Sequence, residues 1–336
     1  MSVQEPLAAP SDSQVWIDAL YDPALSGFLA AAQSRLLATA ARDAPFLAEQ
    51  LTEWITRKLA PEGRPEDYYR KARAYPTLLF PWYVARALGG DGEADAAFHA
   101  DLVYSSINGY YFIRLLDNVM DGEADMETAL LPAAGVLHWE FQAAYRPYFA
   151  ADHPFWSFAG GAWAAAADAA VHDAVLEDIG EAEFLAICGH KSGAAKIPIA
   201  AVCHRYGRAD LIPPWSRFLD RFGAWHQMVN DLFGWEKDSR LGHQTFVLCE
   251  ADRRRRPGEL VADWIAREGF EWGVEILTRW ISELQAEAHG LECPPAVAYL
   301  KKREEWLAVQ ARNGREGLRA LAQLLAAVRV HQRTGA

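Results

Sequence analysis

Cysteine is scarce in this sequence, and its spacing does not suit a metal site. The chain of 336 residues contains 4 cysteines, Cys188, Cys203, Cys249 and Cys293. No two of them form a Cys-x-x-Cys pair, and none has histidines at zinc-finger spacing. We therefore expect reduced and mostly buried thiols.

An excess of basic residues is also missing. The chain has 33 Lys and Arg against 45 Asp and Glu, which gives a formal net charge of −12. Such a balance opposes general attraction to nucleic acid or to anionic lipid. We expect no nucleic-acid partner.

Long apolar segments are absent as well. The first twenty residues contain Glu5, Asp12 and Asp18, which is unlike a signal peptide or a basic transit peptide. The most apolar stretch, 155–171, includes Asp168 and is shorter than the roughly 20 residues that span a bilayer. The sequence therefore predicts no membrane span and a cytoplasmic location.

What the chain does have is a globular, helix-forming composition. Hydrophobic residues make up 51% and charged residues 23%, well outside the disordered range. Alanine and leucine abound, and alternation typical of strands is rare. We predict an all-α fold with residues 1–336 in a single domain and residues 1–12 flexible. Helix breaks are expected near 61–63, 89–90, Pro132, 147–154, 207–214, 253–258 and 294–295.

One segment carries two conflicting signals. Asn108-Gly109 lies between two apolar runs within 102–116, a pattern typical of a β-hairpin. However, Tyr110, Arg114, Asp117 and Asp121 recur at helical steps and so share one face of a helix. We therefore predict a helix here.

On that face, Asp117 and Asp121 are one helical turn apart. Two carboxylates at this spacing can converge on one hard cation such as Mg²⁺. The same spacing also occurs between solvated carboxylates, so the pair alone leaves both interpretations open. It directly follows an apolar run, 110–116, where a purely solvated charged face is less expected.

A second acidic segment spans residues 225–238. On a helix, Gln227, Asn230, Asp231, Gly234 and Asp238 share about a third of the circumference. An apolar strip that includes Phe222 and Trp225 lies beside them, so oxygen ligands are expected next to an aromatic wall. Two such helices facing across a bundle would hold Mg²⁺ and a diphosphate over an apolar cavity.

These two segments resemble the motifs of the class I isoprenoid synthase superfamily, over roughly residues 65–310. Asp117-Asn118-Val119-Met120-Asp121 resembles the aspartate-rich motif, without the doubled aspartate at its head. The segment 230–238 resembles the terpene cyclase motif that begins Asn-Asp, with departures at Gly234 and Asp238. It also resembles the second motif of trans-polyprenyl synthases, with Gln227 upstream. In both comparisons one ligand is missing at Gly234.

Two further segments carry the resemblance. Lys191-Ser192 resembles the Lys-Ser or Lys-Thr at a helix break of these enzymes, where the lysine meets diphosphate. Residues 71–79 resemble, in eroded form, the segment with which polyprenyl synthases grip their second substrate. The arginine pair that usually follows the first motif in chain-elongating enzymes is replaced by acidic residues at 122–127. These differences favour a cyclase over an elongating synthase.

The resemblance implies a bundle of helices around a central apolar cavity, and an enzyme that ionises an allylic prenyl diphosphate and cyclises the carbocation. It implies three Mg²⁺ ions and possible homodimers. The implied metal ligands are Asp117, Asp121, Asn230, Asp231 and Asp238. Positive charge for the diphosphate would come from Arg114, Lys191 and Lys237, and the aromatic wall from Tyr110, Phe222 and Trp225. Arg114 has an alternative role as an ion-pair partner of Asp117 or Asp121.

Other functions stay open. The first alternative is a trans-prenyltransferase that condenses prenyl diphosphates with isopentenyl diphosphate. A phosphohydrolase of the His-Asp type would use His172-Asp173 with His153 and Asp231, although no spacing rule supports that set. A non-catalytic helical binding protein is the third. Paired Glu-x-x-His sequences, which a di-iron bundle requires, are absent from the sequence.

Overall fold

The described part of the chain is entirely helical. The computed structural model describes residues 19–60, 63–70, 74–89, 95–120, 122 and 127–334, with side chains as far as residue 320. In these residues every regular element is a helix and none is a strand, which confirms the all-α prediction. None of the described helices is long and apolar enough to cross a membrane. All four cysteines are free and buried, as expected. The predicted flexible segment 1–12 lies outside the described residues.

The chain divides into two compact units. The first comprises Met1–Ala167 and Gly193–Ser216, and the second comprises Asp168–Ser192 and Arg217–Ala336. Two of the three passages between them fall inside helices, α7 (Pro154–Asp173) and α10 (Ile212–Leu241). The boundaries are therefore not polar linkers, and the single domain stays a prediction.

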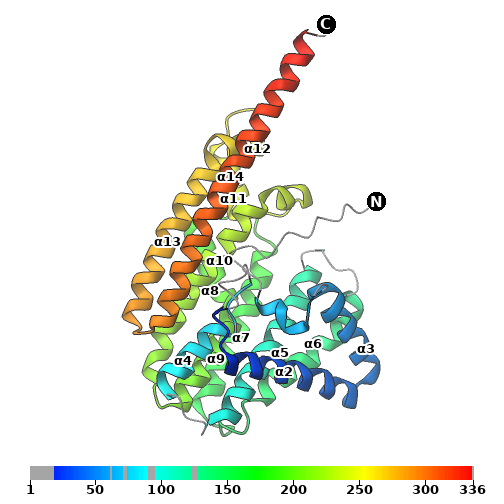
Figure 1. Cartoon of the computed structure of the whole chain (residues 1–336), viewed down its shortest axis with the longest axis vertical. Helices are drawn as coiled ribbons and strands as arrows, with labels where there is room; N and C mark the ends of the chain where they lie inside the picture. The colour runs from blue at the N-terminus through cyan, green and yellow to red at the C-terminus, as the bar shows by residue number, and fades with distance from the viewer. Residues whose placement is uncertain are drawn as a thin grey trace. The chain divides into compact units, whose positions relative to one another are not determined.

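The first unit is built around α5 (Ala96–Met120), which packs against α2, α4, α6 and α9 (Figure 1). Tyr104, Ile107, Tyr111 and Leu115 are fully buried and recur at helical steps, so they form the core stripe of α5. The other elements of this unit are α2 (Pro23–Asp43), α3 (Pro45–Glu53), the π-helix η1 (Trp54–Leu59), the 3₁₀-helices η2 (Pro65–Arg70) and η4 (Ala209–Leu211), α4 (Leu79–Gly89), α6 (Glu127–Ala143) and α9 (Gly193–Arg205).

Asn108 and Gly109 lie inside α5, which confirms the helix and excludes the hairpin. The Asn108 side chain donates from Nδ2 to the carbonyl oxygen of Tyr104, 2.8 Å away and one turn back. A Cβ atom on Gly109 would stand 2.7 Å from Cδ2 of Phe141 in α6. Asn108 therefore adds a hydrogen bond within the helix, and Gly109 lets α5 approach α6 closely, so the pair does not form a turn.

The break expected at Pro132 is wrong, because this proline lies inside α6. It falls within the first two turns, where its missing N–H removes a single backbone bond. Leu130 and Ala133 beside it are buried, and their packing keeps the helix continuous. The break expected at 147–154 is confirmed, since α6 ends at Ala143 and α7 begins at Pro154.

The second unit contains a long helical hairpin of α13 (Phe270–Gly290) and α14 (Pro294–Thr334), which lie side by side (Figure 1). Gly314 of α14 allows this close contact, because a Cβ atom there would stand 2.3 Å from Cζ of Phe270. Its remaining elements are α8 (Glu181–Lys191), α11 (Phe246–Arg254), α12 (Val261–Trp264) and the π-helix η5 (Ile265–Gly269), with the larger part of α10.

Candidate functional site

The first acidic motif, which begins at Asp117, lies at the C-terminal end of α5, in the first unit. The guanidinium of Arg114 donates from Nη1 to Oδ2 of Asp117 at 2.9 Å, and both side chains are exposed by about 40% (38% and 41%). This contact matches the alternative role of Arg114 as an ion-pair partner within its own helix. Asp121 lies outside the described residues.

Tyr110, two turns before Asp117 on α5, belongs to a cluster of tyrosines. Its ring centroid is 5.7 Å from that of Tyr68 and 5.6 Å from that of Tyr69. Burial raises the pKa of the Tyr110 hydroxyl well above its usual value, and the neighbouring Tyr68 adds to the effect. Tyr110 therefore stays protonated and can offer an aromatic face or a hydrogen bond, but not a base.

The second acidic motif lies on α10, in the second unit. Asp231 is buried, with 3% of its surface exposed, and its Oδ1 accepts a hydrogen bond from Nε2 of Gln227 at 2.8 Å. Burial raises the pKa of Asp231 to about 7, although the Gln227 bond opposes the shift. The negative charges of Asp238 and Asp173 raise this pKa further, whereas the positive charge of Lys191 lowers it.

Lys191 is held at the end of α8, close to this motif. Its Nζ donates to Oδ2 of Asp173, the last residue of α7, at 2.7 Å. Both Lys191 and Asp173 influence the pKa of Cys188 and of Asp231, so the four groups form one electrostatic cluster. Glycines let α8 approach α10, since a Cβ on Gly189 would stand 3.1 Å from Cβ of Asp220.

The other predicted ligands on α10 differ in exposure. Asn230 and Lys237 are exposed, whereas Asp238 is mostly covered. Nδ1 of His243 lies 3.7 Å from Oδ1 of Asp238. At Gly234, a Cβ atom would meet Oδ2 of Asp238 at 3.6 Å, an ordinary van der Waals distance. The place of the missing ligand is therefore open to a side chain and adjoins the carboxylate of Asp238.

Phe222 and Trp225, the predicted aromatic wall, lie in the core of the second unit. Both are fully buried. The indole Nε1 of Trp225 donates to the carbonyl oxygen of Leu277 in α13 at 3.1 Å, and the guanidinium of Arg303 lies 5.0 Å from its ring centroid. These contacts are typical of core packing, and the role of the two rings as a cavity wall stays a prediction.

The donors on α10 fit a hard cation in their chemistry. Asn230, Asp231 and Asp238 offer only oxygen ligands, which Mg²⁺ prefers. A bound cation would also offset the burial of the Asp231 carboxylate beside Asp238 and Asp173. Within the described residues, no group of three or more His, Cys, Asp or Glu side chains is arranged to hold a metal ion. Substrate oxygens would therefore have to complete the coordination.

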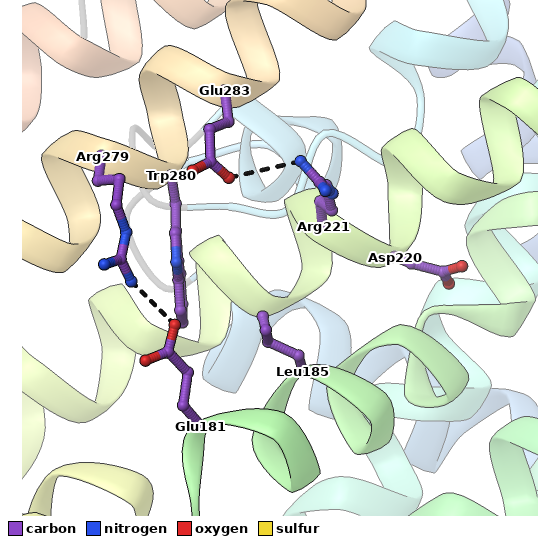
Figure 2. Close-up of a pocket in the computed structure, with 7 residues that line it drawn as sticks. All are labelled: Glu181, Leu185, Asp220, Arg221, Arg279, Trp280 and Glu283. Carbon is purple, nitrogen blue, oxygen red and sulfur yellow. Dashed lines mark hydrogen bonds and ion pairs between the residues drawn. The ribbon is translucent and has the colours of Figure 1, made fainter.

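A surface pocket of about 410 Å³ lies elsewhere in the second unit. Figure 2 shows two ion pairs across it, Arg279 to Glu181 at 2.8 Å and Arg221 to Glu283 at 3.4 Å. Its lining residues are Glu181, Leu185, Asp220, Arg221, Arg279, Trp280 and Glu283. None of the predicted site residues lines it, and its arginines are engaged with glutamates.

The predicted residues thus fall into two sets, one in each unit. Tyr110, Arg114 and Asp117 share the first unit, and Lys191, Phe222, Trp225, Asn230, Asp231, Lys237 and Asp238 share the second. The facing arrangement of the two motifs stays a prediction.

Asp173 is the neighbour of Lys191 that the motif analysis missed. The sequence signal present was His172-Asp173, which indicated a phosphohydrolase rather than a lysine partner.

Neither a scan against protein-family models nor a search of curated proteins finds a match to this chain.

Proposed function

We propose that this chain is a class I terpene synthase, which ionises an allylic prenyl diphosphate and cyclises or rearranges the resulting carbocation. The observation that carries the proposal is in the second unit, where Lys191, bonded to Asp173, lies close enough to the buried Asp231 to lower its pKa, and Asp238 raises that pKa. A lysine beside acidic oxygen ligands is what a metal-bound diphosphate requires. The resemblance of both acidic motifs supports the same chemistry.

In this proposal the side chains have distinct tasks. Asp117 and Asp121 would hold Mg²⁺ from one motif, and Asn230, Asp231 and Asp238 from the other. When bound, Mg²⁺ supplies Lewis-acid stabilisation of the negative charge on the diphosphate. Arg114, Lys191 and Lys237 add positive charge and hydrogen-bond donors for the same group.

The reaction begins with heterolysis of the allylic carbon–oxygen bond, and the electron pair leaves with the diphosphate. The cation that remains is closed or rearranged by the substrate's own double bonds, and it ends by losing a proton or by capturing water. Aromatic faces stabilise such a cation, and an apolar surrounding excludes water until the last step. Tyr110, Phe222 and Trp225 are the proposed aromatic groups.

The test incubates the purified protein and Mg²⁺ with C10, C15, C20 and C25 allylic diphosphates, each with and without isopentenyl diphosphate. Hydrocarbon or terpene alcohol from one allylic substrate alone is the expected result. Products that require isopentenyl diphosphate and are longer by C5 units would replace the proposal with a trans-prenyltransferase. Absence of any product, with no Mg²⁺-dependent binding of diphosphate, would favour a non-catalytic binding protein.

Two substitutions connect the activity to the motifs. Asp117→Ala and Asn230→Ala should each lower turnover by about 10²-fold, since each removes an oxygen ligand. Glu181→Gln, in the pocket of Figure 2, is the matched control and should leave turnover unchanged. Full turnover in both motif variants would contradict the assignment.

A further inference from the structure

Glu127, the first residue of α6, is a fully buried carboxylate in the first unit. Its Oε1 accepts hydrogen bonds from Nε1 of Trp54 at 2.9 Å and from Nδ2 of Asn118 at 2.8 Å. Its Oε2 accepts from Nζ of Lys58 at 2.8 Å. These three contacts are all with donors, and one carries a positive charge, so the surroundings match an ionised carboxylate.

Asn118 belongs to the first acidic motif, yet its side chain faces away from solvent. Only 4% of its surface is exposed, whereas the side chain of the preceding Asp117 is 41% exposed and pairs with Arg114. The bond from Asn118 to Glu127 joins the last turn of α5 to the first residue of α6. The motif therefore has a buried anchor directly beside its exposed acid.

Glu127 explains why residue 118 is an asparagine here. An aspartate at this position would replace the donated amide hydrogen by a second carboxylate at the same 2.8 Å contact, beside the bond from Trp54 to the same oxygen. Two buried carboxylates at that distance repel one another unless one binds a proton. The amide of Asn118 donates to Glu127 without adding a second buried charge.

We propose that Asn118 is a positioning residue, which fixes the last turn of α5 against α6 through Glu127 and so orients Asp117, and that it does not bind metal. The catalytic part of this inference rests on the proposed function. The structural part depends only on the contacts of Glu127. Trp54 and Lys58 extend the anchor to η1, so three segments of the first unit meet at one carboxylate.

The first experiment is a double-mutant cycle on thermal unfolding of the full chain. Asn118→Asp should lower the unfolding midpoint by about 4 °C or more. Adding Glu127→Gln should recover at least half of that loss, because it removes the negative charge next to the new aspartate, and Lys58 keeps an acidic neighbour. If the single variant is insoluble, recovery of soluble protein by the second substitution is the equivalent result. Unchanged stability in Asn118→Asp, or strictly additive effects, would overturn the proposal.

The second experiment separates positioning from metal binding. In Asn118→Asp, kcat should fall while the Mg²⁺ concentration for half-maximal turnover stays within about twofold of the wild type. Adding Glu127→Gln to this variant should restore kcat. An added metal ligand would instead lower the Mg²⁺ requirement, which would contradict the inference. If the wild type turns over no prenyl diphosphate, the proposed function fails, and the unfolding cycle still decides the role of Asn118.

Discussion

Gly109 of α5 and Phe141 of α6 approach so closely that a Cβ atom on the glycine would lie 2.7 Å from Cδ2 of the ring. The two helices pack against one another in the first unit. From this contact, α5 continues to Asp117 of the first acidic motif. Gly109, which the Asn-Gly sequence pattern associates with a turn, therefore forms a close helix–helix contact inside α5.

Gly109→Ala should destabilise the protein by about 1–3 kcal/mol, since the new methyl group overpacks the contact with Phe141. Helix propensity alone would favour alanine by up to about 1 kcal/mol, so the sign of the effect distinguishes the two causes. Denaturant unfolding measures the difference. Gly135→Ala, in α6 with nothing within 4 Å of the added Cβ, is the control and should be neutral or stabilising. A stabilised Gly109→Ala variant would refute the close contact.

Asp231 should make the metal-free protein less stable as the pH rises from about 4 to about 7. Its carboxyl ionises near its ordinary pKa when unfolded but at about 7 when folded, so the folded state holds an extra proton between these values. Each pKa unit corresponds to about 1.4 kcal/mol, which limits the effect to about 4 kcal/mol. Asp231→Asn should remove this dependence.

The measurement is denaturant unfolding of the wild type and of Asp231→Asn at pH 4, 6 and 8 without Mg²⁺. The variant should be the more stable protein at pH 8, and the advantage should shrink toward pH 4. A constant difference across this range would show that Asp231 ionises normally in the folded state.

Gly234→Asp should be tolerated, because the new Cβ would lie at an ordinary 3.6 Å from Oδ2 of Asp238. Without metal, the added charge next to Asp238 should lower the unfolding midpoint. With Mg²⁺ and diphosphate, the extra carboxylate should raise the midpoint above that of Gly234→Ala, the uncharged control. Equal responses of the two variants to Mg²⁺ would argue against a metal at this position.

Lys191→Ala should lower kcat/KM for the prenyl diphosphate by about 10²-fold while changing stability by less than about 1 kcal/mol. About one-third of each side chain in the ion pair with Asp173 remains exposed, so water screens the pair and its contribution to stability is small. Steady-state kinetics and thermal unfolding measure the two quantities. Asp173→Asn, which keeps the lysine, is the matched comparison and should retain most of the activity. A large loss of stability in Lys191→Ala with unchanged kinetics would assign the lysine a structural role.

Trp225→Leu should destabilise the second unit by about 2–4 kcal/mol, since it removes a fully buried ring and the hydrogen bond to the Leu277 carbonyl. Arg303 would also lose the aromatic face beside it. Trp139→Leu, at a position that is 57% exposed, is the control and should cost less than about 1 kcal/mol. If Trp225 also lines the active-site cavity of the proposed terpene synthase, the variant should form a different distribution of products.

Local periodicity was enough to predict the helical class, the continuity of α5 through Asn108-Gly109, and the shared face of Gln227 and Asp231 on α10. These features depend on residues within a few turns of one another, and the helical repeat relates such residues directly to a face. For Arg114 the same reasoning left two roles open, binding the diphosphate or pairing with Asp117 or Asp121, and the structure shows the pair with Asp117 across a single turn.

Only the tertiary structure decided which side chains meet across the fold. The partner of Asn118 is Glu127 on the next helix, and the partner of Lys191 is Asp173 at the end of another. Pro132 stays inside α6, where Leu130 and Ala133 pack into the core. These outcomes depend on the packing of distant segments, because burial determines both the environment of a charged group and the room left for a side chain.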